Sequence, residues 1–467
     1  MASEWRAARI EEVAEKVAMG PFGSSIKVET FVPSGVPVIS GQHLHGYKLD
    51  ESVEFNFVSR EHADRLKNAN VQRGDIIFTH AGNIGQVAYV PEDSKFERYV
   101  ISQRQFYMRC DRSKIIPEFV VAYFKTPEGQ HRLLANASQV GVPSIAQPVT
   151  YLRTIEIPVP PLSEQRAIAH ILGTLDDKIE LNRRMNETLE AMACAIFKSW
   201  FVDFDPVIDN ALRAGNPIPS VLAEKAARRR ELLSRANAEG RDSCFPKHIA
   251  ALFPDRFVDS ELGPIPAGWP LVSLIEIIEI NPPRPLAQGQ VAPYLDMANM
   301  PTHGHAPDNV VLRPFSSGTR FINGDTLMAR ITPCLENGKT AFVDFLNYKQ
   351  VGWGSTEYII LRSKPPLPEE FAYLLARSRE FRDFAIQSMT GTSGRQRVQP
   401  EALSHYRLIS PPTPISNVFG VFVKPLFSQA RKIVTESQVL ATIRDALLPK
   451  LIRGELSVAG LRRGKNE

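Results

Sequence analysis

The sequence predicts an α+β fold in which two duplicated modules, each mostly antiparallel β with helices, are separated by two long helices. Three observations support this prediction. The chain has 467 residues, which is more than one hydrophobic core usually accommodates. Short motifs recur in order at an offset close to 250 residues, as expected for a duplication. Each copy is followed by about 40 residues of helical pattern, so we expect the helices to pack as an antiparallel coiled coil with pseudo-twofold symmetry.

The first module is predicted over residues 1–157. Short β-like runs, such as 36–39 and 75–78, are separated by glycine and proline, and a helical stretch follows from Pro117 to Asn136. These features predict an α+β module with a mostly antiparallel sheet.

A long helix is predicted over residues 158–204, because the pair Pro160-Pro161 stops any earlier helix and Ser163 can cap a new one. Apolar residues then recur at a spacing of three and four, which is typical of a coiled-coil seam. Asn182 occupies the same track, and a buried asparagine indicates a partner helix in a fixed register. The alternative is a single long core helix of one globular domain. The residues predicted to pack are Ile168, Leu172, Leu175, Ile179, Asn182, Leu189 and Ile196.

The second half repeats the first. Residues 73–78 are matched by residues 323–328, and a connecting segment over 205–261 precedes the second module at 262–410. In that segment Arg228–Arg230 could touch phosphate, although a solvated face explains them as well. The C-terminal helix is predicted over 411–456, with Pro425 kinking it or delaying its regular part, and a basic tail at 457–467. Its predicted packing residues are Leu426, Ile433, Leu440, Ile443 and Leu447.

Composition constrains the environment. The formal net charge of +4 permits a nucleic-acid partner without requiring one. The four cysteines are far apart, with no CxxC pair, which predicts a reducing compartment and neither a zinc site nor disulfides. We see neither a signal peptide nor an apolar run of membrane-spanning length. These features predict a cytoplasmic protein with no membrane partner.

No catalytic or metal site is predicted. Asn281-Pro282-Pro283-Arg284 resembles the Asn-Pro-Pro-aromatic loop of adenine methyltransferases, but arginine replaces the aromatic residue and no glycine-rich cofactor turn accompanies it. Gly338-Lys339-Thr340 resembles the end of a P-loop, but Pro333 stands where the leading glycine is required. A self-contained methyltransferase or nuclease that uses residues 281–283 therefore remains only an alternative.

Loops in both halves carry side chains that can read base edges or hold phosphate. Arginine and glutamine form paired hydrogen bonds with guanine and adenine, whereas hydroxyl and backbone N–H groups hold phosphates. Ordinary polar turns are the alternative explanation for any single residue. The candidate DNA-binding residues are Ser24, Ser25, Lys27, Gln42, His43, Asn83, Gln103, Arg104, Gln105, Ser138, Gln139 and Ser144 in the first half, and Arg284, Asn299, Arg330, Thr332, Asn337, Lys339, Thr392, Ser393, Arg395, Gln396 and Arg397 in the second.

Several longer motifs, together with these features, resemble the specificity subunit of type I restriction–modification enzymes. They are Gly-Pro-Phe-Gly-Ser at 20–24, Ile-Pro-Val-Pro-Pro-Leu-Ser-Glu-Gln-Arg at 157–166, Lys-Ser-Trp-Phe-Val-Asp-Phe-Asp-Pro-Val at 198–207, Glu-Leu-Gly-Pro-Ile-Pro-Ala-Gly-Trp at 261–269 and Leu-Leu-Pro-Lys-Leu-Ile-Arg-Gly-Glu-Leu at 447–456. The second Pro-Pro departs from the pattern, since Thr413-Pro414 follows it. The charged stretch at 221–238 also looks longer than usual.

The resemblance implies a function for each part. Each module would be a target recognition domain for one half of a bipartite, asymmetric DNA site, and the paired helices would set the spacer. Two modification (methyltransferase) subunits and two restriction (motor/nuclease) subunits would bind the chain. S-adenosylmethionine, ATP and Mg²⁺ would belong to those partners, so the chain itself would direct adenine methylation and cleavage without catalysis or a cofactor. A helical scaffold that binds only protein is a further alternative.

Overall fold

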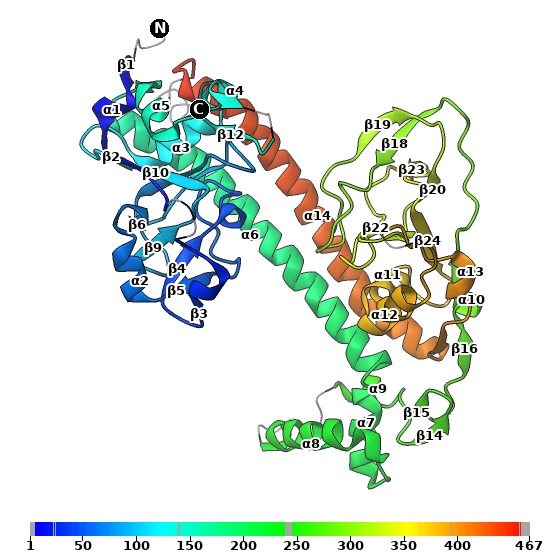
Figure 1. The fold of residues 1–467 in the computed structure, drawn as a ribbon. Coiled ribbons are helices and arrows are strands. Elements are labelled where there is room, and N and C mark those ends of the chain that lie inside the picture. The colour runs from blue at the N-terminus through cyan, green and yellow to red at the C-terminus, as the bar shows by residue number, and fades with distance from the viewer. Residues whose placement is uncertain are drawn as a thin grey trace, which may run out of the picture. The chain divides into compact units, whose positions relative to one another are not determined.

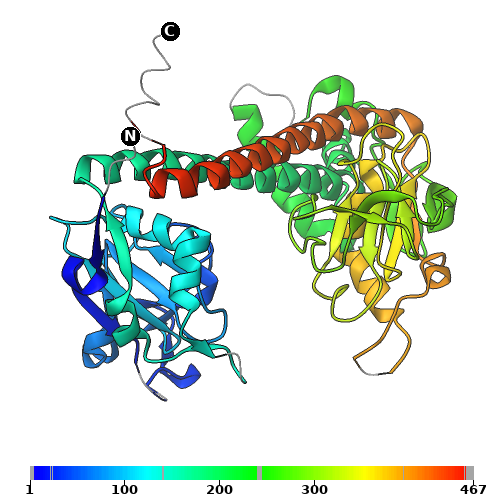
Figure 2. The same cartoon turned by 90° about the horizontal axis from the view of Figure 1, so that it is seen from above.

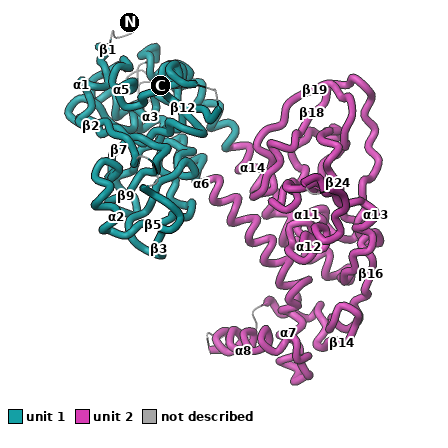
Figure 3. The backbone as a smooth tube through the Cα atoms, in the orientation of Figure 1, with its two compact units in different colours: residues 1–181, 437–467 teal, residues 182–436 magenta. Residues whose placement is uncertain are grey.

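The computed structural model (Figure 1) describes residues 5–21, 23, 25–138, 141–238, 245–392, 394–456 and 458. The chain forms two compact units (Figure 3). The first unit contains Met1–Leu181 and Ser437–Glu467, and the second contains Asn182–Glu436. Each of the two long helices therefore contributes one half to each unit. None of the described helices is both long and apolar enough to cross a bilayer.

The first unit contains two main sheets. One is antiparallel with the order β2-β10-β7-β8, and the other has the order β3-β5-β4-β9-β6, in which β4 and β9 are parallel. Two short pairs, β1-β13 and β11-β12, complete it. The strands are β1 (Arg6–Arg9), β2 (Ala14–Met19), β3 (Phe31–Val32), β4 (Val36–Ile39), β5 (Asn56–Val58), β6 (Asn70–Gln72), β7 (Asp75–Thr79), β8 (Val87–Tyr89), β9 (Arg98–Ile101), β10 (Gln105–Cys110), β11 (Ala137–Ser138), β12 (Ser144–Ile145) and β13 (Glu156–Val159).

Short helices cover the antiparallel sheet of the first unit. The α3 helix is buried along most of its length, and its Phe124 ring meets the Phe78 ring of β7 at 5.3 Å between centroids. Thr126 caps α4 by accepting a hydrogen bond from the Gly129 N–H. The helices of the first module are α1 (Ile10–Val13), η1 (Val28–Thr30), η2 (Gly41–His43), α2 (Arg60–Arg65), η3 (Lys67–Ala69), α3 (Pro117–Lys125), α4 (Pro127–Leu134) and α5 (Pro148–Thr154).

The second unit repeats the strand order of the first. Its antiparallel sheet is β17-β24-β21-β22, and its mixed sheet is β19-β18-β23-β20, in which β18 and β23 are parallel. The pair β16-β25 corresponds to β1-β13, and the hairpin β14-β15 belongs to the connecting segment. The strands are β14 (Phe257–Ser260), β15 (Gly263–Pro266), β16 (Leu271–Ser273), β17 (Ile278–Ile280), β18 (Val291–Leu295), β19 (Val311–Pro314), β20 (Thr319–Phe321), β21 (Thr326–Ala329), β22 (Thr340–Phe342), β23 (Gly352–Gly354), β24 (Tyr358–Ser363) and β25 (Arg407–Ile409).

The helices of the second module follow the same plan, and the connecting segment adds α7, η4, α8 and α9. There Arg229 of α8 donates from Nε to Oδ1 of the buried Asp209 of α7 at 2.7 Å. This ion pair fixes α8 on α7, so Arg229 is not part of a free basic surface. The helices are α7 (Asp205–Ala214), η4 (Ser220–Leu222), α8 (Ala223–Ala238), α9 (Lys247–Ala250), α10 (Leu274–Ile277), α11 (Glu370–Arg377), α12 (Arg379–Gln387) and α13 (Pro400–Leu403).

Two equivalent aspartates demonstrate the duplication at the level of contacts. Asp75 begins β7 and pairs with Arg109 of β10, while Asp325 directly precedes β21 and pairs with Arg362 of β24. Both carboxylates are fully buried, so each arginine offsets the cost of removing a charge from water. The predicted duplication is therefore confirmed by topology and by these buried ion pairs.

The two long helices, α6 (Leu162–Phe201) and α14 (Thr413–Ile452), each have 40 residues. In the first unit the beginning of α6 packs on the end of α14, where Ile168 and Leu172 share a buried cluster with Leu448 and Leu451 (Figures 1 and 2). The α6 helix begins at Leu162, so Ser163 lies in its first turn rather than at the cap. Pro425 lies inside α14, so the prediction of a delayed helix is wrong.

In the second unit the end of α6 packs on the beginning of α14, so the helices are antiparallel, as predicted. Phe197 and Trp200 of α6 meet Phe419 of α14 at ring distances of 6.3 and 5.9 Å. Asn182 is fully buried, and its Nδ2 donates to Glu436 Oε2 at 2.9 Å. This polar pair fixes one alignment of the two helices, because other registers would bury the amide without this partner.

The predicted packing residues differ in burial. Ile168, Leu172, Asn182 and Ile433 are buried, and the side chain of Ile443 is 43% exposed. The prediction for Ile443 is wrong because Arg444 occupies the contact position in that turn and pairs with Asp176 at 3.0 Å. The remaining predicted positions are half-buried: Leu175, Ile179, Leu189, Ile196, Leu426, Leu440 and Leu447.

Candidate nucleic-acid interface

Three loops of the first unit are joined where β7 ends. The His80 N–H donates to the Arg104 carbonyl at 2.9 Å, and the Ile145 N–H donates to the His80 carbonyl at 2.8 Å. The Gly82 N–H also donates to the Pro143 carbonyl at 2.9 Å. We call residues 80–86, 102–105 and 141–146 the first edge. Its loops come from distant parts of the chain, yet backbone hydrogen bonds hold them as one surface.

The second unit has the same arrangement where β21 ends. The Arg330 N–H donates to the Glu357 carbonyl at 3.0 Å, and the Val398 N–H donates to the Arg330 carbonyl at 2.8 Å. The Thr332 N–H donates to the Gln396 carbonyl at 3.1 Å. We call residues 330–339, 355–357 and 390–399 the second edge. The same three backbone hydrogen bonds therefore join equivalent loops in both units.

The two edges share a backbone frame but carry different side chains. The bridge between Ala81 and Ser144 corresponds to the bridge between Ile331 and Arg397. At the position of Arg104 in the first edge, the second edge has a carboxylate, Glu357. A pair of similar frames with exchanged charge can recognise two different ligand surfaces without any change of fold.

On the first edge, Asn83, Gln103 and Arg104 are exposed, and Ser144 is half-buried. The η2 turn adjoins this edge, since Gln86 Nε2 donates to the Gly41 carbonyl at 3.0 Å. The turn exposes Gln42. Asn83, Gln103, Arg104, Ser144 and Gln42 therefore belong to one region of the first unit, with Ser138 nearby on the strand that pairs with Ser144.

Ser25 and Lys27 lie in the loop that leads into η1. The Ser25 carbonyl contacts His62 Nε2 of α2 at 2.8 Å, and Lys27 is exposed at the start of η1. Three further predicted residues, Ser24, Gln139 and Ser393, lie outside the described residues. Their role stays a prediction.

Two residues predicted to contact DNA are buried instead. His43 is 2% exposed, and its ring stacks on Phe55 at 4.3 Å; burial lowers the pKa of His43, which favours a neutral ring. Gln105 is 1% exposed and accepts a hydrogen bond from the Ser102 hydroxyl. Gln105 is the first residue of β10 and faces the interior, so only its neighbours are accessible. Both predictions are wrong for this reason.

On the second edge, Asn337, Thr392 and Arg395 are exposed, whereas Arg397 is half-buried and pairs with Glu357 at 2.8 Å. Other predicted residues form hydrogen bonds within the second unit. Arg330 Nη2 donates to Gln399 Oε1 at 2.8 Å, Thr332 Oγ1 accepts from the Gln396 N–H at 3.2 Å, Lys339 Nζ donates to the Met297 carbonyl at 2.5 Å, and Asn299 Nδ2 donates to Asp296 Oδ1 at 2.8 Å.

The structure does not place Arg284 on the second edge. Its Nη2 donates to Asp325 Oδ1 at 2.8 Å and its Nε donates to Oδ2 at 3.1 Å. Asp325 precedes β21, whereas the second edge follows the other end of that strand. The prediction of a DNA contact for Arg284 is therefore wrong, because a buried carboxylate 41 positions away along the sequence holds the side chain.

The methyltransferase-like tripeptide has a structural role. Asn281 Oδ1 accepts a hydrogen bond from the Ile360 N–H, and the Asn281 N–H donates to the Ile360 carbonyl, both at 2.9 Å. The side chain thus closes the end of a strand pair and is not available to hold a substrate amino group. Among the described residues, no group of three histidine, cysteine, aspartate or glutamate side chains is placed to bind a metal ion.

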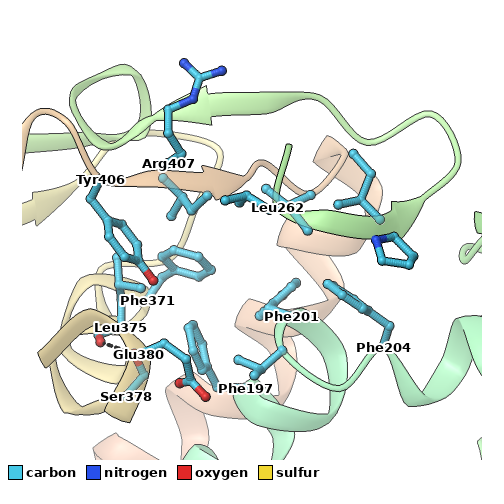
Figure 4. Close-up of a pocket in the computed structure, with 15 residues that line it drawn as sticks. Phe197, Phe201, Phe204, Leu262, Phe371, Leu375, Ser378, Glu380, Tyr406 and Arg407 are labelled. Carbon is cyan, nitrogen blue, oxygen red and sulfur yellow. Dashed lines mark hydrogen bonds between the residues drawn. The ribbon is translucent and has the colours of Figure 1, made fainter. Parts of the chain in front are cut away.

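A pocket in the second unit has a lining of mixed character. Its volume is about 250 Å³, and phenylalanine side chains line it together with Glu380, Tyr406 and Arg407 (Figure 4). The Ser378 hydroxyl at its wall donates to the Leu375 carbonyl at 2.7 Å. None of the predicted DNA-binding residues lines this pocket.

Glu357 is not among the residues predicted to contact DNA. Matching the two halves nevertheless places Thr356-Glu357-Tyr358 opposite Gln103-Arg104-Gln105. The strand register supplies the same correspondence, since Thr79 faces Gln105 and Ala329 faces Tyr358.

Comparisons with known proteins agree with this architecture. Residues 2–191 match the family described as type I restriction modification DNA specificity domain. The specificity subunit of the type I restriction enzyme HindI from Haemophilus influenzae is 24% identical and aligns with 83% of this chain and 87% of its own length. The MjaIX specificity subunit from Methanocaldococcus jannaschii is 22% identical over 98% of this chain and 95% of its own. The crystal structure of a type I S subunit from M. genitalium has a TM-score of 0.53 at 15% identity, covers 96% of each chain and supports the fold.

Proposed function

Because the chain belongs to the type I restriction–modification specificity subunits, we propose that its two edges read the two different halves of a bipartite, asymmetric DNA site. The observation that carries this proposal is the shared backbone frame with different side chains. Two identical halves would read a symmetric site. The exchange of Arg104 for Glu357 at equivalent positions instead supports two distinct half-sites.

Specificity subunits of this family are not catalytic, and the chain is the DNA-recognition component rather than an enzyme. Adenine methylation and ATP-dependent cleavage are proposed to be carried out by two modification subunits and two restriction subunits bound to it. S-adenosylmethionine, ATP and Mg²⁺ are assigned to those partners, and the complex to the cytoplasm. A self-contained methyltransferase is not favoured, since the Asn281 side chain is bonded to the main chain of Ile360.

The paired helices α6 and α14 are proposed to set the length of the unread spacer. Each has 40 residues, and one turn contributes about 6 Å of length. The Asn182–Glu436 contact supports this proposal, because a spacer of defined length needs two helices that cannot slide past each other.

The proposed function can be tested with the chain bound to its modification subunits. Genome-wide mapping of methylated adenines should return one bipartite motif. Replacing Asn83 and Arg104 on the first edge with alanine should relax one half of that motif and leave the other half and the spacer unchanged. Arg112→Ala changes an exposed arginine outside this edge and is the matched control, which should leave the motif intact. Relaxation of both halves together by the first-edge substitutions would contradict the assignment of one edge to one half-site.

A further inference from the structure

Arg397 and Glu357 form a paired contact on the second edge. Arg397 Nε lies 3.0 Å from each carboxylate oxygen of Glu357, and Nη2 lies 2.8 Å from Oε1. The Arg397 side chain is 37% exposed and that of Glu357 is 25% exposed. The guanidinium therefore has one side fixed on the carboxylate while part of it remains accessible to solvent.

Hydrogen bonds fix the main chain at both Arg397 and Glu357. The Arg397 N–H donates to the Thr390 carbonyl at 2.9 Å, and the Thr390 N–H returns a bond to the Arg397 carbonyl at 3.0 Å. Arg397 also forms the bridge to Ile331. The Glu357 N–H donates to the Ser355 hydroxyl at 3.1 Å. A side chain fixed in this way loses little conformational freedom when it binds a ligand.

The Arg397 guanidinium keeps N–H groups that can bind a ligand. A guanidinium has five N–H groups. The Nε N–H and one Nη2 N–H face Glu357. One Nη1 N–H donates to the Arg395 carbonyl at 3.3 Å. Within the part of the chain that the structure describes, one N–H on each terminal nitrogen stays available. Two parallel donors match the O6 and N7 acceptors that guanine presents in the major groove.

We propose that Arg397 reads a guanine in the half-site of the second unit and that Glu357 is the residue that positions it. This inference rests on the proposed function. A phosphate could also accept two N–H groups, but the carboxylate beside Arg397 neutralises its charge and repels an anion. Exposed Arg395 lies two residues earlier in the same loop and has no such carboxylate among its described contacts, so it is the better phosphate ligand.

The first unit cannot make the same contact. Its bridge position is Ser144 instead of Arg397, and its position equivalent to Glu357 is Arg104, which is exposed. The arginine is thus presented from the opposite loop of the frame and without this carboxylate partner. The two half-sites should therefore differ in the position at which an arginine meets a base.

The test measures sequence preference with the chain in complex with its modification subunits, by binding selection on randomised half-sites and by methylation mapping. Arg397→Ala should reduce discrimination at one base pair of one half-site by roughly five- to 150-fold, with guanine preferred there in the unaltered protein. Arg397→Lys keeps the charge but loses the two-donor geometry, and should show the same relaxation with most of the affinity retained. The half-site of the first unit, read by the same preparation, shows that the protein is folded.

Glu357→Gln distinguishes positioning from a purely structural role. It should reduce discrimination at the same base pair. It should also steepen the salt dependence of binding by about one counterion, because the freed guanidinium can then reach a phosphate. Arg395→Ala is the matched control, and it should weaken binding to all sequences alike while leaving base preference unchanged.

Uniform weakening by Arg397→Ala, or an unchanged preference in that variant, would overturn the inference. An unchanged salt slope for Glu357→Gln would remove Glu357 from the positioning role. These outcomes are distinct from a failure of the proposed function, in which the unaltered complex would show no bipartite preference at all.

Discussion

Replacing Arg109 with methionine should destabilise the first unit more than Arg284→Met destabilises the second. Within the described residues, Asp75 pairs with Arg109, through Nε to Oδ1 at 2.8 Å and Nη2 to Oδ2 at 2.7 Å. Asp325 pairs with both Arg284 and Arg362. Losing Arg109 leaves a fully buried carboxylate without an ionic partner, which costs about 3–5 kcal/mol. Losing Arg284 leaves Arg362 in place, so the cost should be nearer that of hydrogen bonds to a charged group, about 1.5–3 kcal/mol.

The Arg109→Met effect should also depend on pH. Burial raises the pKa of Asp75, and the hydrogen bonds from Arg109 oppose that rise. Without Arg109 the pKa in the folded state should rise further above the unfolded value. The folded state then binds the proton more tightly than the unfolded state, so the variant gains stability as the pH falls. Its deficit relative to the unaltered chain should therefore shrink between about pH 7 and pH 5.

Hydrogen exchange at the strand amides is the appropriate assay, because a chain with two units has no single unfolding free energy. Exchange in β7 and β10 reports the first unit, and exchange in β21 and β24 reports the second. Arg112→Met, at an exposed arginine of the first unit, controls for loss of surface charge. Equal effects of Arg109→Met and Arg284→Met, or a deficit for Arg109→Met that grows as the pH falls, would refute this reasoning.

Three other predictions follow from the helices and their contacts. Inserting one turn of four residues into both α6 and α14 at the same level should lengthen the preferred spacer by about 6 Å, which is nearly two base pairs, without altering either half-site. Both helices must change because they are paired. Methylation mapping would show the new spacer, and an unchanged spacer would contradict the proposal. Leu172→Ala should cost about 2–5 kcal/mol in the first unit by hydrogen exchange, whereas Ile443→Ala, at an exposed position, should cost under about 0.5 kcal/mol; comparable costs would be inconsistent with the observed seam. Burial lowers the pKa of Lys125 to about 8. The first unit should therefore become more stable between about pH 8 and 9.5, because the folded state releases the proton before the unfolded state does. Lys125→Met should abolish that rise in stability.

The duplication and the long helices could be predicted because their signals are local. A Gly-Asp pair before a β-like run recurs 250 residues later, and in both copies the aspartate is the buried partner of an arginine on the adjacent strand. The helix pattern depends on spacing of three and four, which the chain carries without reference to the rest of the fold. The same pattern predicts that Asn182 packs between the helices, and in the structure Asn182 is buried against Glu436.

The individual contacts could not be predicted, because they depend on residues distant in sequence. The sequence predicts a DNA contact for Arg284, but the fold of the second unit places this side chain on the buried Asp325. The sequence predicts a DNA contact for His43, but its ring stacks on Phe55. The apolar spacing of the second helix allowed Ile443 in the seam, and only the contact of Arg444 with Asp176 shows which side of that turn faces α6.

The main-chain bonds that join the loops of each edge do not involve the side chains that differ between the edges. Loops 330–339, 355–357 and 390–399 could therefore be transplanted onto the strands of the first unit in place of their counterparts. A chain with the same loops on both frames should select a palindrome, so one polypeptide would act as a symmetric dimer does. New target sequences could then arise by recombining loop sets, with the strands and helices unchanged.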